Sequence, residues 1–195
     1  MEEKLSLSEY LFSIRFYVLF VFVLFIGSIV LGYAGFPNEL FSNQMDELQQ
    51  LIEEIRNITQ PYPIWATFLF YFAVIFSNNA FKCFLNIILG PLIGFFPLFS
   101  TFINGGLIGL VIQEWGLIVF LGILLLYGIF ELPAFLLSAA IGLRLGREVL
   151  KRKNERHFKR ELGKALKVFV ILILPLLLIA AIIESALIVA TLSLV

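Results

Sequence analysis

Polar side chains that could carry chemistry stand inside otherwise apolar segments of this chain. Asn78, Lys82 and Asn86 recur at four-residue spacing, so a helix places all three on one face. Glu131 stands within the apolar segment 117–143, where a carboxylate costs about 2.5–3.5 kcal/mol to insert at the bilayer centre. We therefore expect Glu131 to face neighbouring helices and to be paired or protonated there.

Other residues add polar groups near Glu131. Tyr127 lies one helical turn before it and is placed to donate a hydrogen bond, and Pro133 leaves a backbone carbonyl of the preceding turn without its usual partner. Lys82 pairs with Glu131 if the two lie at equal depth in the bilayer. The full set of candidate residues comprises Tyr127, Gly128, Glu131, Pro133, Asn78, Asn79, Lys82, Asn86, Asn104 and Glu184. Two interpretations stay open: hydrogen bonds that hold helices together, or a path for a proton, an ion or a substrate.

The residue inventory disfavours an enzyme. One histidine, His157, and one cysteine, Cys83, provide neither an internal disulfide nor a His/Cys metal cage. No nucleophile stands beside a base, and no phosphate-binding loop is visible. Serines such as Ser138 are ordinary small residues of membrane helices. We expect no catalytic residue, no bound metal and no cofactor.

The elements that position these residues follow from composition. Of the 195 residues, 61% are hydrophobic and 14% charged, and the mean hydropathy is +1.00. Soluble domains run nearer 45–50% apolar and about 25% charged. The composition therefore predicts an all-α, polytopic bundle of transmembrane helices. Apolar runs long enough to span a bilayer predict five spans, near 16–35, 64–89, 91–112, 117–143 and 168–195; a cut after Lys82 would give six.

Two polar connections separate these spans. In residues 38–60 an apolar stripe recurs at helical spacing, which predicts an amphipathic helix outside the membrane; its members are Phe41, Met45, Leu48, Ile52 and Ile55. Residues 144–167 hold ten Lys/Arg against three Glu, and Glu148/Arg152 and Glu155/Lys159 are spaced as i, i+4 ion pairs. We expect the second connection to be solvated and to meet anionic lipid headgroups.

The distribution of basic residues predicts the orientation. With an inner N-terminus, five spans place Lys4, Arg15, Lys82 and the ten basic residues of 144–167 inside, and only Arg56 outside. The positive-inside rule favours that arrangement. We expect a plasma-membrane protein with its N-terminus in the cytoplasm and its C-terminus outside.

Small residues at four-residue spacing permit close approach of helices. They occur at Gly90/Gly94, Gly105/Gly109 and Ser138/Gly142/Gly146. Packing within one chain is the favoured interpretation, and a homo-oligomer interface is the alternative.

Two stretches carry a family resemblance. Residues 127–146, YGIFELPAFLLSAAIGLRLG, resemble the signature helix of the stage II sporulation protein M (SpoIIM) family, which shows an HGxxELP-type motif before a run of small residues. Residues 76–109, FSNNAFKCFLNIILGPLIGFFPLFSTFINGGLIG, resemble the family's Asn-containing helix and its following NG helix. The matching positions are Gly128, Glu131, Leu132 and Pro133, with Asn79 (or Asn78) and Asn104-Gly105. The chain departs from the motif at Tyr127, where the family usually has histidine.

The resemblance implies a membrane anchor of the kind that recruits peptidoglycan-remodelling hydrolases. The leading hypothesis is therefore a non-enzymatic membrane scaffold that docks membrane or cell-envelope proteins on segment 38–60 and on the basic connection. The alternative is a transporter or permease-like component that uses Glu131, Lys82 and the Asn stripe. Nucleic-acid binding is not expected, because membrane topology already explains the basic cluster.

Overall fold

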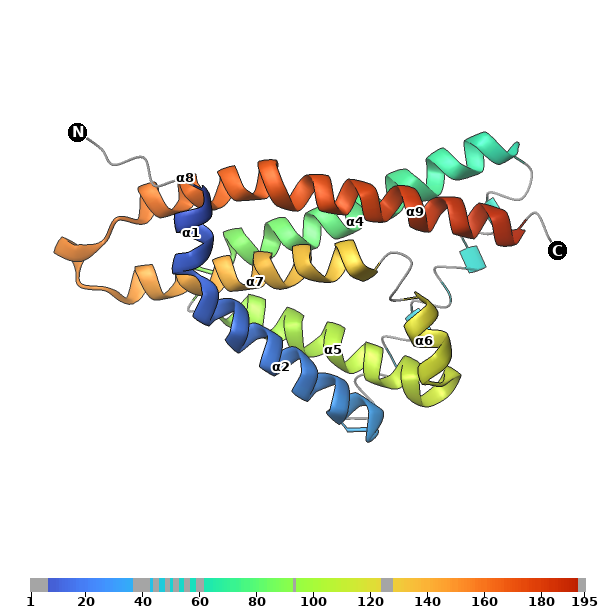
Figure 1. The fold of residues 1–195 in the computed structure, drawn as a ribbon, viewed down its shortest axis with the longest axis horizontal. Coiled ribbons are helices and arrows are strands. Elements are labelled where there is room, and N and C mark those ends of the chain that lie inside the picture. The colour runs from blue at the N-terminus through green and yellow to red at the C-terminus, as the bar shows by residue number, and fades with distance from the viewer. Residues whose placement is uncertain are drawn as a thin grey trace.

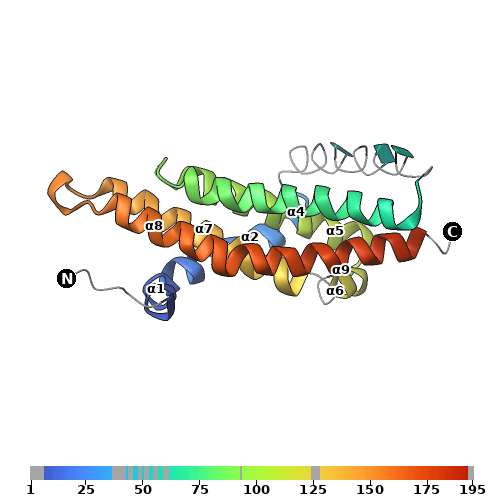
Figure 2. The ribbon, with the colours of Figure 1, turned by 90° about the horizontal axis from the view of Figure 1, so that it is seen from above.

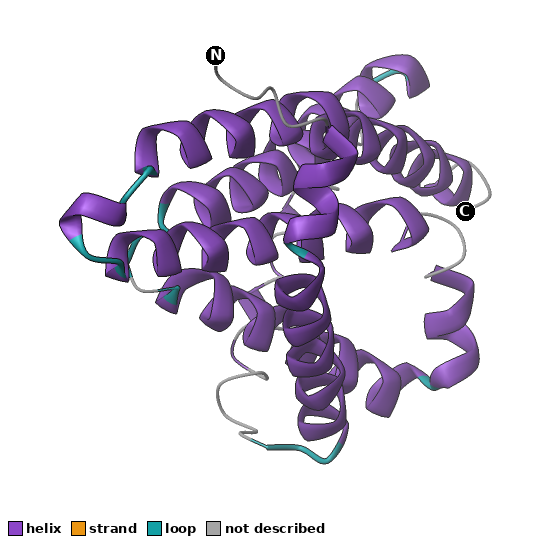
Figure 3. Ribbon diagram, turned by 60° about the vertical axis from the view of Figure 1, so that its left-hand side comes forward, coloured by secondary structure: helices purple, strands orange, loops and turns teal. Residues whose placement is uncertain are grey.

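The computed structural model describes residues 7–36, 62–92, 94–123 and 128–192, together with positions 43, 46, 47, 50, 53, 54, 57 and 58. Within these residues the regular structure is entirely helical (Figure 3). Five helices are long and apolar enough to cross a membrane: 15–33, 64–88, 95–115, 129–150 and 158–192. The predicted fold class, an all-α bundle of five spans, is confirmed.

Most of the long helices run roughly lengthwise along the molecule, and some are inclined to its long axis (Figure 1). They are α1 (Leu7–Ser13), α2 (Arg15–Tyr33), α4 (Ile64–Ile88), α5 (Phe95–Trp115), α6 (Leu117–Ile123), α7 (Ile129–Leu150), α8 (Phe158–Val168) and α9 (Leu174–Leu192). Figure 1 shows α1 crossing the bundle near the turn from α7 to α8, whereas α9 ends at the opposite end. Seen from above, α4 and α9 run side by side along much of their length (Figure 2).

The central helix of the bundle is α7. It contacts α2, α4, α5, α8 and α9, and half of its most apolar window is buried, the highest share of the five spans. The sequence of α7 fits this central position, because small residues at 138–140 and at 142 let neighbouring backbones approach. Large apolar side chains on the outer helices point outward, as lipid-facing positions should; they include Phe20, Val23, Val30, Leu69, Ile171 and Ile179.

Glycines make the closest helix contacts. A Cβ added to Gly142 of α7 would overlap the backbone of Asn86 in α4, and one added to Gly90 would overlap the backbone of Gly142. A Cβ on Gly109 of α5 would likewise overlap the backbone of α2 near Gly32. At these positions the predicted packing within one chain is confirmed.

The fourth span differs from its prediction of 117–143. Residues 117–123 form the separate short helix α6, and the spanning helix α7 begins only at Ile129 and continues to Leu150. Hydropathy alone could not distinguish the two helices, because both are apolar. Gly116, at φ +86°, turns the chain after α5 in a conformation that glycine adopts readily.

The third and fifth spans are also displaced. The third begins at Phe95, after Gly94 at φ +74°, and not at Pro91. The fifth is longer than 168–195, because α8, a π-helical turn at Phe169–Ile173 and α9 follow one another directly. The π turn ends two residues before Pro175, whose missing N–H and bulky ring disturb the regular α-helical bonding of the preceding turn.

The basic connection 144–167 is mostly helical. Its first seven residues complete α7 and its last ten belong to α8, with a short 3₁₀ turn at Lys153–Glu155 between them. We call this arrangement the α7–α8 hairpin. By contrast, the apolar stripe predicted for the outer helix 38–60 lies outside the described residues.

Candidate functional site

Glu131 lies at the start of a helix and not in the middle of one. It occupies the first turn of α7, and its side chain is half-buried. A carboxylate in a first turn is favoured by the helix dipole and by free N–H groups. Pro133 follows within the same early part of the helix, where proline is tolerated better than deeper inside. Tyr127, its expected hydrogen-bond donor, lies outside the described residues.

Three titratable side chains of three spans are near enough to interact electrostatically. They are Lys82 of α4, Glu131 of α7 and Glu184 of α9, and no ion pair joins them among the described residues. Lys82 is exposed and Glu184 is half-buried. The pairing of Lys82 with Glu131 therefore stays a prediction, and Glu184 is an additional member that sequence spacing did not link to them.

Asn86 joins α4 to α7 at their closest approach. Its side-chain Nδ2 donates to Ser138 Oγ at 3.0 Å, and Ser138 Oγ donates to the carbonyl of Phe135 at 2.7 Å. The sequence analysis treated Ser138 as an ordinary small residue; its spacing of four from Gly142 was the signal that it faces a neighbouring helix.

The remaining asparagines do not converge on Asn86. Asn78 is exposed and Asn79 is half-buried, although the helical spacing had placed Asn78, Lys82 and Asn86 on one stripe. Asn104 donates to the carbonyl of Ser100 within its own helix, at 2.7 Å. The predicted stripe of Asn78, Lys82 and Asn86 is therefore divided: the first two side chains are exposed, and Asn86 is buried against α7. The reason is that neighbouring helices cover only part of the circumference of α4.

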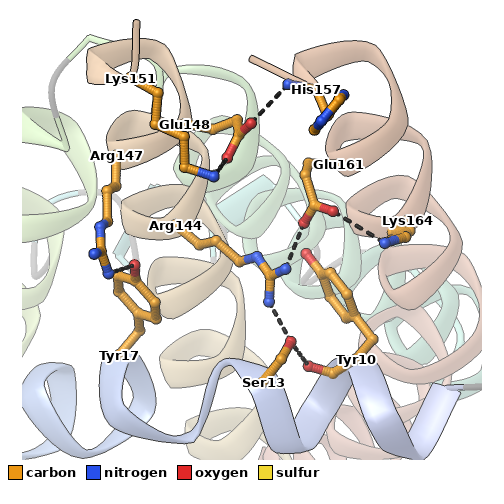
Figure 4. Close-up of polar contacts among 10 residues, drawn as sticks. All are labelled: Tyr10, Ser13, Tyr17, Arg144, Arg147, Glu148, Lys151, His157, Glu161 and Lys164. Carbon is orange, nitrogen blue, oxygen red and sulfur yellow. Dashed lines mark hydrogen bonds and ion pairs between the residues drawn. The ribbon is translucent and has the colours of Figure 1, made fainter. Parts of the chain in front are cut away.

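A second polar cluster lies where α1, α2 and the α7–α8 hairpin meet (Figure 4). We call it the hairpin cluster. It contains Tyr10, Ser13, Tyr17, Arg144, Arg147, Glu148, Lys151, His157, Glu161 and Lys164.

The centre of the hairpin cluster is an ion pair between α7 and α8. The Arg144 guanidinium meets Glu161 at 2.7 Å, and the Lys164 ammonium meets the same carboxylate at 3.0 Å. Arg144 also donates to Ser13 Oγ, and Ser13 Oγ donates to the carbonyl of Tyr10 at 2.6 Å. Because Glu161 is buried, its charge needs these partners.

Glu148 is the second buried carboxylate of the cluster. It pairs with Lys151 and accepts a hydrogen bond from the backbone N–H of His157 at 2.7 Å. The sequence analysis expected Glu148 to pair with Arg152 at i, i+4, but it pairs with Lys151 instead. The reason is that α7 ends at Leu150 and the backbone of Lys151 is extended, so helical spacing does not continue to Arg152. The other expected pair, Glu155/Lys159, is likewise divided between the 3₁₀ turn and α8.

Tyr10 is a buried phenol beside these charges. Its hydroxyl has no hydrogen-bond partner among the described residues, and the Arg144 guanidinium lies 4.8 Å from its ring centroid. Burial raises the pKa of Tyr10 to about 12; the nearby Arg144 opposes this shift and Glu161 adds to it.

The raised pKa of Tyr10 predicts a loss of stability at high pH. Between about pH 10 and pH 12 the unfolded chain loses the phenolic proton while the folded chain retains it. The free energy of unfolding should therefore fall by at most about 1.4 kcal/mol per pH unit in this range. Chemical unfolding in detergent at several pH values measures it. Tyr10→Phe should remove this part of the slope and, at pH 7, leave stability equal or slightly higher, since it deletes an unbonded hydroxyl. An unchanged slope in Tyr10→Phe would contradict the assignment.

The five spans and their buried polar contacts define a polytopic, all-α membrane protein. The family model described as "Stage II sporulation protein M" matches residues 16–187. The chain therefore belongs to the SpoIIM family. A protein of Methanocaldococcus jannaschii, described as uncharacterized, is 31% identical over 127 residues, which are 64% of this chain and 56% of that relative. No solved structure matches the chain.

Proposed function

We propose that the protein is a membrane scaffold that holds partner proteins at the plasma membrane, and not an enzyme. The observation that carries this proposal is the α7–α8 hairpin. Buried Glu148 and Glu161 hold the two arms of the hairpin together through ion pairs, and Arg144 and Arg147 join it to Ser13 and Tyr17 by hydrogen bonds. Several basic side chains of the hairpin are exposed. The exposed ones include Arg147, Arg152, Arg156, Lys159, Arg160 and Lys167. A surface with fixed geometry and an excess of positive charge suits docking of an acidic partner.

The orientation that we propose places this hairpin in the cytoplasm. Segment 38–60 then faces outward, where it provides a second docking surface for cell-envelope proteins. The support is the basic excess at the hairpin end and the arrangement in Figure 1, in which α1 lies at that end and α9 finishes at the other.

Cysteine accessibility tests this orientation. In a Cys83→Ser background, a cysteine at position 50 should react with a membrane-impermeant reagent from outside whole cells, and one at position 156 only after the cells are opened. The reverse pattern would contradict the orientation. A cysteine at position 27, whose glycine faces open space on α2, is the membrane-embedded control and should stay unreactive.

Site-specific photocrosslinking tests the scaffold itself. A photoreactive residue at 152 or 156 should give the same discrete protein adduct in intact cells, because both positions lie on the exposed part of the hairpin. Reversing the charge of Lys159 and Lys167 to Glu should reduce that adduct several-fold. Position 23, on the lipid-facing side of α2, is the control. If only lipid adducts form at all three positions, the scaffold proposal fails.

The transporter alternative rests on the grouping of Lys82, Glu131 and Glu184. The two functions predict different results for Glu131→Gln. An amide keeps the shape and most hydrogen bonds, so for a scaffold the adduct at position 156 should persist and the melting temperature should change little. For a proton-coupled transporter, the same variant should fold but lose transport. Melting temperature, crosslinking and whole-cell fitness under the same conditions distinguish the two.

A further inference from the structure

A hollow of about 350 Å³ opens on the hairpin cluster. It is lined by α1, the start of α2, α7 and α8, through Ser13, Tyr17, Arg144, Arg147, Glu148, Lys151, His157, Arg160 and Glu161. Its volume falls at the small end of the range for small-ligand sites. Four cationic and two acidic side chains line it, so the hollow carries a net positive charge.

The acidic side chains of the hollow are already neutralised. Glu161 is paired with Arg144 and Lys164, and Glu148 with Lys151 and the His157 backbone. Two guanidiniums remain without an acidic partner among the described residues. Arg147 donates to the Tyr17 hydroxyl at 2.9 Å, and Arg160 lines the opening from α8. Both side chains are exposed, so they are available to an anion.

Two features near the hollow are those expected at the boundary between a membrane and water. Helix α1 crosses the bundle beside it (Figure 1), as a helix lying in the interface would. Phe12 of α1 and Phe16 of α2 are about two-thirds exposed, and the Arg15 guanidinium stacks over both rings. Aromatic rings paired with cations at a helix end are typical of the membrane–water boundary.

We propose that this hollow binds the phosphate of an anionic glycerophospholipid, with Arg147 and Arg160 as the contacting residues. Guanidinium groups bind phosphate oxygens in a bidentate manner. The Tyr17 hydroxyl orients Arg147, and the paired Glu148 and Glu161 keep the walls of the site fixed. A bound lipid then fastens α2 to the α7–α8 hairpin. This proposal does not depend on the identity or the existence of a protein partner.

Native mass spectrometry of the full chain, delipidated in detergent, tests the site. We expect one molecule of dioleoyl phosphatidylglycerol to bind about tenfold more tightly than dioleoyl phosphatidylcholine. The double substitution Arg147→Gln/Arg160→Gln should weaken phosphatidylglycerol binding about tenfold, since two charge-assisted contacts are lost. Lys159→Gln/Lys167→Gln removes the same charge from exposed positions of α8 outside the hollow and should change binding less than twofold.

Three outcomes would overturn the proposal. Equal losses in both double variants would show a general attraction of the basic hairpin and no defined site. Displacement of the lipid by inorganic phosphate at the same concentration would show that the hollow is a site for a free anion and not for a lipid. A single substitution, Arg160→Gln, covers the case in which loss of the Arg147–Tyr17 contact prevents folding, because Arg160 forms no hydrogen bond or ion pair with the other described residues. Unchanged lipid binding in that variant, with an unchanged melting temperature, would also refute the assignment.

Discussion

Gly142→Val should prevent stable folding. A Cβ at this position overlaps the backbone of Asn86 and lies 2.9 Å from the Pro97 ring, so α4 and α5 would both have to move away from α7. Overpacking of a well-packed interior costs about 1–3 kcal/mol when side chains can adjust. We expect more than about 3 kcal/mol here, because two backbones oppose each other and neither can adjust by a rotamer change.

Size-exclusion profiles and thermal unfolding in detergent measure this loss. Gly27→Val is the matched control, because Gly27 also lies in a spanning helix but has nothing within 4 Å of an added Cβ. That variant should keep the wild-type profile, with a change of at most about 0.5 kcal/mol. If Gly142→Val folds as well as Gly27→Val, the close contact of α4 and α7 is wrong.

Arg144→Met should destabilise the protein by about 3 kcal/mol. The substitution leaves Glu161, which is 4% exposed, with only Lys164 to balance its charge. Removing one partner of a buried pair costs about 3–5 kcal/mol, and we take the lower end because Arg144 itself is partly exposed. Loss of the contact to Ser13 also loosens α1 from α7.

A double-mutant cycle separates the charge from the packing. Glu161→Leu added to Arg144→Met removes the unpaired carboxylate and should recover most of the lost stability, as apolar replacements of buried ion pairs often do. Urea unfolding followed by tryptophan fluorescence provides the four free energies. Strict additivity of the two substitutions would show that the pair is not coupled in the folded protein.

The sequence alone determined that this is an all-α membrane protein with five spans. Burial of apolar segments in lipid depends on composition and length, which are local properties that can be counted along the chain. Gly90, Gly105, Gly109 and Gly142 were also recognised as packing positions, because small residues at four-residue spacing lie on one helix face whatever the partner is. The candidate residues Glu131 and Lys82 were likewise found as charges in apolar surroundings.

Only the tertiary structure decided which of these residues meet. Helical periodicity places Asn78, Lys82 and Asn86 on one face, but the crossing of α4 and α7 buries Asn86 and leaves the other two less covered. Hydropathy could not locate the start of α7 either, because 117–128 is as apolar as the helix that follows. Glu131 therefore moved from the middle of a predicted span to a helix N-terminus, where its charge is better tolerated.

The hairpin cluster could not be predicted from the sequence either, because its members come from distant segments of the chain. Arg144 and Glu161 are seventeen residues apart, and Ser13 and Tyr10 come from the other end of the chain. The sequence identified a basic connection and assigned its acids to neighbours four residues away, since spacing within one helix is the only pairing that a sequence shows directly. The packing of the α7–α8 hairpin against α1 and α2 decides which cations have an acidic partner and which remain available to the proposed lipid phosphate. This packing joins segments that are distant in the sequence, so spacing along the chain does not reveal it.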